Sequence, residues 1–334
     1  MSRIAILGGG SWGTALAIVL SRARRKHEIS LWVHDRTLAE FIRRDRENRS
    51  YLPGYLLDAE VNVTSEIRDA TSGAQILIGA IPTAHARAVY SAAAASVSLG
   101  SIFVSAAKGL EPATHKRMSE VVFEVFSRKS VPRVAVLSGP SFAAEVARGE
   151  PTAVVLASSD AAFTAEVQDE FAAPNFRVYT NEDVLGVELA GAMKNVIAIA
   201  AGVCQGLGLG SNPLAALITR GLAEMSRLAA ALGAEPETLT GLAGLGDLVL
   251  TCTGALSRNR QVGIELGKGR TLTEILAGMR TVAEGVGTTA ALLALAREAK
   301  VELPITQQVE AILHEGKPPR EVIRDIMERP QRPE

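Results

Sequence analysis

The chain has 334 residues, of which 47% are hydrophobic and 21% are charged, enough for two domains with sizeable cores. Its formal net charge of −1 argues against a general nucleic-acid-binding or membrane-surface role, although a local basic pocket can still bind a small anion. The two cysteines, Cys204 and Cys252, lie far apart and form no ligand-spaced cluster, so we expect no structural zinc site and a reducing, cytoplasmic location.

The first element is a short apolar run, Ile4–Leu7, which predicts a buried parallel strand and is too short for a signal peptide. Glycines follow it, and a helical pattern rich in Ala, Leu and Ile begins at Thr14. Gly8, Gly10 and Gly13 therefore fill G-x-G-x-x-G between a strand and a helix, the context in which this motif indicates dinucleotide binding. The first glycine would allow the tight turn, the second the approach of a pyrophosphate, and the third close packing of helix on strand. The alternative is an ordinary glycine turn.

A second strand is predicted over Glu28–Val33, and it ends in His34, Asp35 and Arg36. A dinucleotide-binding unit places its ribose-reading residue here, about 20 residues after the glycine loop. Asp35 suits a free 2′-hydroxyl, whereas Arg36 and His34 suit a 2′-phosphate, so both NAD and NADP stay open. Asp35 is equally interpretable as a residue of the turn that ends the strand.

Polar residues with a helical tendency follow over 37–60, and after them apolar runs alternate with helical segments. These runs predict further strands at 75–81, 101–105, 133–137 and 152–157, with another candidate at 177–179. Such alternation favours an α/β fold with a doubly wound sheet. The segments GGGSWG, IPT, AAKGLE and SGPSF each begin where a predicted strand ends, and ligands of such sheets bind at the carboxyl ends of strands.

The second half of the chain is predicted to be helical. Its helical patterns cover 184–201, 220–232, 273–279, 288–300, 305–314 and 319–327, and no stretch is apolar for about 18 residues without a break. We therefore predict a dinucleotide-binding domain over residues 1–182 and an all-helical substrate and catalytic domain over 183–334, with no transmembrane helix.

Lys194 lies in the middle of an apolar helical pattern. At 3.6 residues per turn it shares a face with Leu189 or Ala190 and with Ile197 or Ala198. A lysine facing the apolar side would be partly desolvated, and its pKa would fall towards a range useful for acid–base chemistry. The alternative is that its ammonium group reaches out to solvent.

Three more positions suggest chemistry, each beside a simpler interpretation. Lys108 follows a strand and has small neighbours, so it points either into a ligand crevice or to solvent. Asp247 lies among apolar residues and glycines, where a carboxylate needs a hydrogen bond or a cationic partner, or else caps the next helix. Ser257, Arg258 and Asn259 precede a helical pattern and form either a phosphate cradle or a plain N-cap.

These residues lie in motifs that resemble those of one family, and the motifs occur in that family's order from the first strand to about residue 315. They are GGGSWGTALA, LWVHD, SAAKGLE, SGPSFAAEVARGEPTAVVLAS, GAMKNVIAIAAG, LITRGLAEMSRLAAALGA, GLAGLGDLVLTCTGALSRNR and VAEGVGT. The family is the bacterial NAD(P)-dependent glycerol-3-phosphate dehydrogenases. The resemblance implies a Rossmann-type domain joined to a helical domain, with the active site in the cleft between them.

The resemblance also implies the reversible reduction of dihydroxyacetone phosphate to sn-glycerol 3-phosphate with NADPH or NADH, which supplies glycerophospholipid synthesis. The motif positions identify as cofactor contacts Gly8, Gly10, Ser11, Trp12, Gly13, His34, Lys108, Ala143, Arg258, Val282 and Glu284. They identify as substrate contacts Lys108, Gly139, Ser141, Lys194, Asp247, Ser257, Arg258 and Asn259, with Lys194 as the catalytic proton donor and acceptor. We expect a homodimer without stable membrane insertion.

The residues and the resemblance agree on a mechanism. Reduction of the carbonyl builds negative charge on its oxygen, and Lys194 is the best-placed donor for that atom. Lys108 would polarise the carbonyl or hold the substrate, Asp247 would orient a lysine or a hydroxyl, and Arg258 would hold the phosphate. No metal is expected. One rival is a related dehydrogenase for hydroxyacyl or sugar-acid substrates, and another is a non-catalytic nicotinamide-binding sensor, which would not need both lysines, Asp247 and Arg258.

Overall fold

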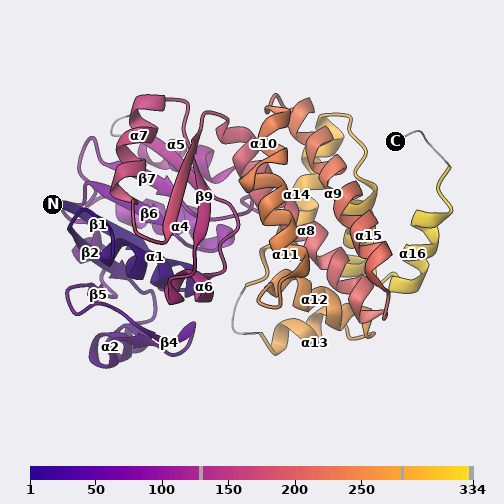
Figure 1. Ribbon diagram of the computed structural model, residues 1–334, viewed down its shortest axis with the longest axis horizontal. Coiled ribbons are helices and arrows are strands. Elements are labelled where there is room, and N and C mark those ends of the chain that lie inside the picture. The colour runs from indigo at the N-terminus through magenta and orange to yellow at the C-terminus, as the bar shows by residue number, and fades with distance from the viewer. Residues whose placement is uncertain (128–130, 280–281, 331–334) are drawn as a thin grey trace. The chain divides into compact units, whose positions relative to one another are not determined.

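A computed structural model describes residues 1–127, 131–279 and 282–330 (Figure 1). The chain divides into two compact units, Met1–Glu188 and Leu189–Glu334.

The first unit is built on a sheet of eight strands in the order β10-β9-β8-β7-β6-β1-β2-β5. Its strands are β1 (Ser2–Leu7), β2 (His27–Trp32), β5 (Asn62–Thr64), β6 (Ile76–Gly79), β7 (Ile102–Ser105), β8 (Arg133–Ser138), β9 (Thr152–Ala157) and β10 (Phe176–Asn181). Strands β1, β2, β5, β6, β7 and β8 are parallel, whereas β9 runs antiparallel to β8 and β10 runs parallel to β9. The segments that follow β1, β6, β7 and β8 therefore share one edge of the sheet, as the sequence predicts.

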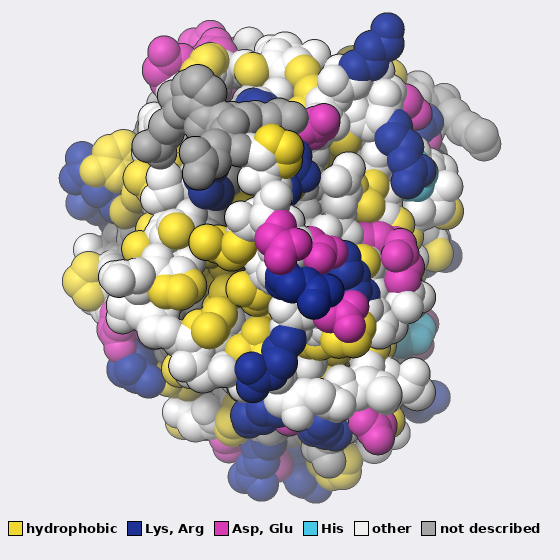
Figure 2. Space-filling view, turned by 90° about the vertical axis from the view of Figure 1, so that its right-hand side faces the viewer, with side chains coloured by type: hydrophobic (Ala, Val, Ile, Leu, Met, Phe, Trp, Pro, Cys, Tyr) yellow, Lys and Arg dark blue, Asp and Glu magenta, His cyan; other side chains and the backbone are white. Residues whose placement is uncertain are grey.

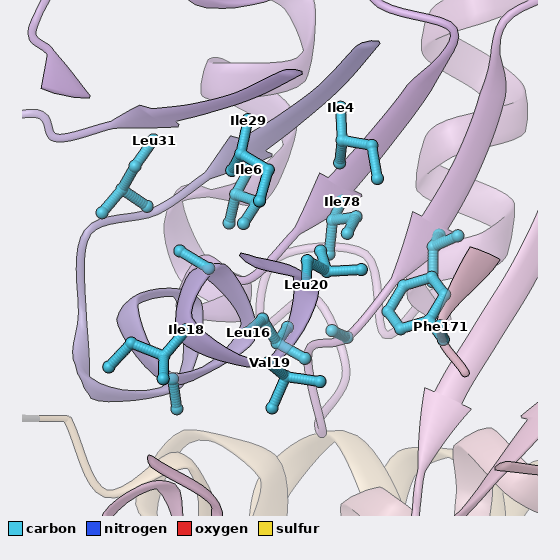
Figure 3. Packing of buried hydrophobic residues seen from close by; sticks show 14 of the residues in the cluster. Ile4, Ile6, Leu16, Ile18, Val19, Leu20, Ile29, Leu31, Ile78 and Phe171 are labelled. Carbon is cyan, nitrogen blue, oxygen red and sulfur yellow. The ribbon is translucent and has the colours of Figure 1, made fainter. Parts of the chain in front are cut away.

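Helices cover both faces of this sheet. The helices of this unit are α1 (Ser11–Ser21), α2 (Arg36–Asp45), α3 (Ile67–Thr71), α4 (Thr83–Ala94), α5 (Met118–Phe126), α6 (Ala143–Arg148) and α7 (Ala161–Glu170). Alternate residues of β1 divide between two cores, one shared with α1, α6 and α7 and the other with α3, α4 and α5. In Figure 3, Leu16 and Leu20 of α1 pack below Ile6 and Ile29 of the sheet. Each such side chain contributes about 1.5–3 kcal/mol when it is fully buried.

Two features of this unit differ from the predicted elements. The short strand β5 was not among the predicted strands. A hairpin of β3 (Glu47–Asn48) and β4 (Leu52–Leu56) occupies part of the segment for which helix was favoured. Pro53 and Gly54 lie inside β4, and both residues weaken the local signal of a strand. The helical part of that segment is α2, and the residue after its last turn, Arg46, has the left-handed conformation with φ 56°.

Helices build the described part of the second unit. They are α8 (Val184–Gly206), which begins in the first unit, α9 (Ser211–Ala231), α10 (Pro236–Thr240), a π-helix η1 (Leu242–Gly246), α11 (Asp247–Thr253), α12 (Arg258–Gly267), α13 (Leu272–Ala277), α14 (Glu284–Glu298), α15 (Pro304–His314) and α16 (Pro319–Met327). The prediction that this half is helical is confirmed. Helix α9 begins at Ser211 rather than Arg220, because Pro213 near its start is compatible with the first turn of a helix.

By length and composition, α8 is long and apolar enough to cross a membrane. The same holds for the bent pair Pro236–Thr253 and Arg258–Gly267 if the two segments are taken as one span. In α8, 83% of the apolar window is buried inside the protein, as in the core helix of a soluble protein. On the face of the molecule shown in Figure 2, basic and acidic side chains lie interspersed, as expected for a net charge near zero.

Candidate functional site

The glycine loop between β1 and α1 is shaped by contacts that only glycine permits. Gly8 has φ +122°, and a Cβ atom there would lie 2.4 Å from the carbonyl oxygen of Ala80. A Cβ atom at Gly13 would lie 1.9 Å from the carbonyl oxygen of Gly8, so this glycine lets α1 pack directly on the turn. These two positions have the geometry that the motif predicts.

Gly10 differs from its neighbours because a Cβ atom there would meet no described heavy atom within 4 Å. It is the N-cap of α1, and no side chain caps the helix at that position. The first N–H groups of a helix have no partner within the helix and favour an anion. Trp12, next to the loop, has a buried Nε1 with no hydrogen-bond partner in the described part of the chain. The loop thus fits a cofactor that brings a pyrophosphate and a hydrogen-bond acceptor.

The residues that follow β2, His34, Asp35 and Arg36, are all exposed. Asp35 is the N-cap of α2 and accepts a hydrogen bond from the Leu38 N–H at 2.8 Å, so it has the capping role of a turn residue. Arg36 forms an ion pair with Glu40 at 3.2 Å, and its side chain is 81% exposed. The ring of His34 lies 5.7 Å from that of Trp32, between ring centres.

Lys108 lies in the loop after β7, where the structure brings three predicted substrate residues together. Its Nζ donates to the carbonyl oxygen of Gly139 at 2.7 Å and to the Ser141 hydroxyl at 3.1 Å. Gly139 has φ +116°, which turns the chain sharply after β8, and Ala143 then opens α6. The carboxyl ends of β7 and β8 therefore place one cation beside the loop that contains Ser141.

The loop of Lys108 is anchored by an ion pair between Arg87 and Glu111 that the sequence did not suggest. The buried carboxylate of Glu111 accepts two hydrogen bonds from the Arg87 guanidinium, each at 2.8 Å. These bonds lower the pKa of Glu111 despite its burial. Glu111 is three residues after Lys108, so this ion pair fixes one end of the loop.

In the second unit, Lys194 and Asp247 form a buried ion pair. Their side chains are 7% and 2% exposed, and Nζ lies 2.7 Å from Oδ1. Nζ also donates to the Thr251 hydroxyl at 3.0 Å, and that hydroxyl donates to the Asp247 carbonyl oxygen at 2.6 Å. Lys194 thus faces inward, as one of the two interpretations of its helix predicted. The adjacent carboxylate stabilises its ammonium form.

Asp247 owes its position to the π-helix that precedes it. In η1 (Leu242–Gly246), a Cβ atom at Gly244 would lie 2.0 Å from the carbonyl oxygen of Leu239, so this turn packs directly on α10. Single turns of π-helix occur frequently at functional sites. Asp247 begins α11 as a residue of its first turn and does not act as its cap, because the N-cap residue is Gly246.

Ser257, Arg258 and Asn259 form the start of α12. Ser257 is the N-cap, and its hydroxyl accepts from the Arg260 N–H at 3.3 Å. The Arg258 side chain is exposed overall, but desolvation by nearby protein lowers the pKa of its guanidinium, an effect that Glu284 opposes. Ser257 therefore caps the helix and Arg258 lies beside its N-terminus, an arrangement that is compatible with both interpretations of the segment.

The side chain of Asn259 is engaged inside the protein. Its Nδ2 donates to Asn195 Oδ1 at 2.9 Å, and its Oδ1 accepts from the Gly285 N–H at 3.0 Å. This chain of bonds joins α8, α12 and the start of α14. Glu284 is the first residue of α14, and Val282, which is 45% exposed, lies two residues before it. Asn259 is thus bonded to Gly285, the residue that follows Glu284.

Two polar residues of this cluster were missed in the sequence. Thr251 follows Asp247 by four residues and so lies on the same helix face, and Asn195 directly follows Lys194. Both signals are local and weak without a known partner. Among the described residues, no group of three or more His, Cys, Asp or Glu side chains is arranged to hold a metal ion.

Two family models match the chain. The model described as the NAD-dependent glycerol-3-phosphate dehydrogenase N-terminus matches residues 3–164, and that described as its C-terminus matches residues 183–324. Both the glycine loop and the Lys194–Asp247 pair lie within these matches.

Several named relatives span the whole chain. The glycerol-3-phosphate dehydrogenase [NAD(P)+] of Koribacter versatilis is 55% identical over 331 residues, which cover 99% of this chain and 98% of that protein. That of Acidobacterium capsulatum is 54% identical over 339 residues, covering 100% of each. The crystal structure of glycerol-3-phosphate dehydrogenase from Coxiella burnetii superposes with a TM-score of 0.92 at 40% identity, covering 98% of this chain and 99% of that one. The chain belongs to the NAD-dependent glycerol-3-phosphate dehydrogenase family.

Proposed function

We propose that the chain catalyses the reversible reduction of dihydroxyacetone phosphate to sn-glycerol 3-phosphate with NADPH or NADH. The observation that carries this proposal is the buried pair of Lys194 and Asp247, held further by Thr251. Reduction of a ketone needs a preorganised donor where the negative charge develops on oxygen. A charged lysine fixed by two partners is such a donor, whereas a plain nicotinamide-binding sensor has no need of one.

The cofactor is assigned to the residues that the motifs identify. The first unit contributes Gly8, Gly10, Ser11, Trp12, Gly13, His34, Lys108 and Ala143, and the second contributes Arg258, Val282 and Glu284. The glycine loop and the N-terminus of α1 would bind the pyrophosphate, and the unpartnered Nε1 of Trp12 offers one more donor. When bound, the nicotinamide supplies the hydride in reduction and accepts it in oxidation.

The substrate phosphate is assigned to the N-terminus of α12. Backbone N–H groups in the first turn of this helix have no partner within the helix, and Arg258 beside them can bind a phosphate through two parallel hydrogen bonds. The side-chain amide of Asn259 is already bonded to Asn195 and Gly285, so we assign the backbone N–H of Asn259 to the phosphate. The Ser257 hydroxyl holds the turn in place.

Lys194 is assigned as the catalytic proton donor in reduction and acceptor in oxidation. Asp247 stabilises its ammonium form. The Thr251 hydroxyl accepts a hydrogen bond from the Lys194 Nζ and donates one to the Asp247 carbonyl oxygen. Both partners restrict the rotamers of the lysine. Lys108, with Gly139 and Ser141 around its Nζ, would hold the substrate or polarise its carbonyl group.

We further propose a cytoplasmic homodimer that binds no nucleic acid, is not inserted in a membrane, and supplies the glycerol backbone of phospholipids. The interspersed charges on the face in Figure 2 favour the absence of nucleic-acid binding, and the burial of α8 favours the absence of a membrane span. A domain boundary after residue 182 stays a prediction, close to the end of the first compact unit at Glu188.

Removing the phosphate from the substrate tests the proposed reaction. We expect kcat/KM for unphosphorylated dihydroxyacetone to be about 10³-fold lower than for dihydroxyacetone phosphate, because two charge-assisted hydrogen bonds of about 2 kcal/mol each are lost. Turnover should fall as well as affinity, since binding energy of the phosphate orients the carbonyl. Initial rates of NADPH oxidation measure both constants.

The matched control is Arg258→Ala, which should remove most of the difference between the two substrates. Similar kinetics of the unchanged enzyme with both substrates would contradict the assignment of a phosphate site.

A further inference from the structure

The structure points to Asn48 as a positioning residue of the glycine loop, an inference that rests on the proposed cofactor site. Asn48 lies in β3 and is 0% exposed. Its Nδ2 donates to the carbonyl oxygen of Gly9 at 2.9 Å and to the Thr14 hydroxyl at 2.8 Å. One buried amide thus bonds to the loop and to the first turn of α1, and it comes from a part of the chain 39 residues away.

We propose that Asn48 sets the direction of the Gly10 N–H towards the cofactor pyrophosphate. The Gly9 carbonyl and the Gly10 N–H belong to the same planar trans peptide, so they point in opposite directions. Because Asn48 holds the carbonyl oxygen, the N–H is turned away from the hairpin. Gly10 is also the position where an added Cβ would meet no described atom within 4 Å. The amide therefore orients a backbone donor in the open part of the loop.

The Asn48 side chain is itself held by the turn of its hairpin. Its Oδ1 accepts from the Tyr51 N–H at 3.2 Å, and the Tyr51 carbonyl oxygen accepts from the Ser11 hydroxyl at 2.6 Å. The turn over residues 48–51 therefore bonds to Gly9 in the glycine loop and to Ser11 and Thr14 in the first turn of α1. Leu52, 3% exposed, anchors the same hairpin in the core that also contains α1.

The path of the chain explains why this hairpin reaches the loop. Helix α2 is followed by Arg46 in the left-handed conformation, which ends the helix just before β3. The Arg46 guanidinium then bonds to the carbonyl oxygens of Asp58 and Val61, so both ends of the 46–61 segment are tied together. The hairpin is thus a rigid support on which a phosphate-binding loop can be preorganised.

Asn48→Ala should raise the Kd for NADPH about tenfold, because the free energy of about one hydrogen bond that orients the loop is lost. ADP-ribose, which carries the pyrophosphate without the nicotinamide, should weaken in parallel, whereas AMP, which lacks it, should bind as before. Titration of fluorescence and calorimetry measure these constants without turnover. With saturating NADPH, kcat should stay near its original value while KM for NADPH rises.

Asn48→Asp is the second variant, because it keeps the shape and the acceptor for Tyr51 but loses both donors. Its NADPH affinity should fall further than that of Asn48→Ala, and salt should recover only the extra loss, which comes from the new charge beside the phosphates. Asn175→Ala is the matched control, since Asn175 Nδ2 also donates to a glycine carbonyl, that of Gly149 at 2.7 Å, away from the loop. The control should leave every Kd unchanged.

A purely structural role would lower the melting temperature of both Asn48 variants without a change in Kd below that temperature, and this result would overturn the inference. An equal loss of NADPH and AMP binding would overturn it too. Either result leaves the proposed function standing, which fails instead when the unchanged chain binds neither NADPH nor NADH.

Discussion

Lys194→Ala is expected to lower the single-turnover rate of dihydroxyacetone phosphate reduction by at least about 10³-fold. The substitution removes a proton donor, worth about 10²–10⁴-fold, and a positive charge beside the developing alkoxide. Lys194→Arg should not restore the rate, because a guanidinium does not release its proton near neutral pH. Rapid mixing of enzyme, NADPH and substrate, followed by the decay of NADPH fluorescence, measures this step.

The buried position of Lys194 demands a control for stability. Its removal leaves the Asp247 carboxylate, which is 2% exposed, without its cation, and a broken buried pair costs about 3–5 kcal/mol. The double variant Lys194→Met, Asp247→Asn has no unpaired charge, so it should unfold at nearly the original temperature and still be inactive. If Lys194→Ala or the double variant kept a rate within about tenfold of the original, Lys194 would not be the acid, and Lys108 would become the first candidate.

Gly10→Val is expected to abolish detectable binding of NADPH and to leave the fold intact. The backbone at Gly10 has φ −79° and ψ −174°, which valine adopts easily, and an added Cβ would meet no described atom within 4 Å. Its branched side chain would instead occupy the place of the pyrophosphate. Titration with NADPH fluorescence measures binding, and circular dichroism with thermal unfolding measures the fold.

Gly13→Ala provides the contrast to this variant. Its Cβ would lie 1.9 Å from the Gly8 carbonyl oxygen, so it should lower the melting temperature, unlike Gly10→Val. NADPH affinity near the original value in a folded Gly10→Val would show that the loop does not bind the pyrophosphate.

The elements that the sequence predicted well are those with a strong local pattern. Continuous apolar runs such as Ile76–Gly79 predicted the parallel strands, and Thr152–Ala157 was predicted to the residue. The direction of β9 was not predictable, because a run buried on both faces has the same pattern in either direction. The β3–β4 hairpin was missed because Pro53 and Gly54 suppress its strand signal.

The same distinction applies to the site. The sequence left open whether Asp247 has a cationic partner and whether Lys194 faces inward, and it could not indicate that the two residues pair with each other. Thr251 lies 57 residues from Lys194 along the chain, and such pairings are set by how helices pack. Asn48 belongs to no motif, because its contacts with Gly9 and Thr14 join segments 39 and 34 residues apart and arise only when the chain folds.

The proposed reaction is tested most directly by mixing the purified chain with dihydroxyacetone phosphate and NADPH, and in parallel NADH, and following the loss of reduced cofactor. We predict oxidation that depends on enzyme and substrate, with sn-glycerol 3-phosphate as the product in stoichiometric amount. Oxidation no faster than without protein, while NADPH still binds, would contradict the proposed reaction.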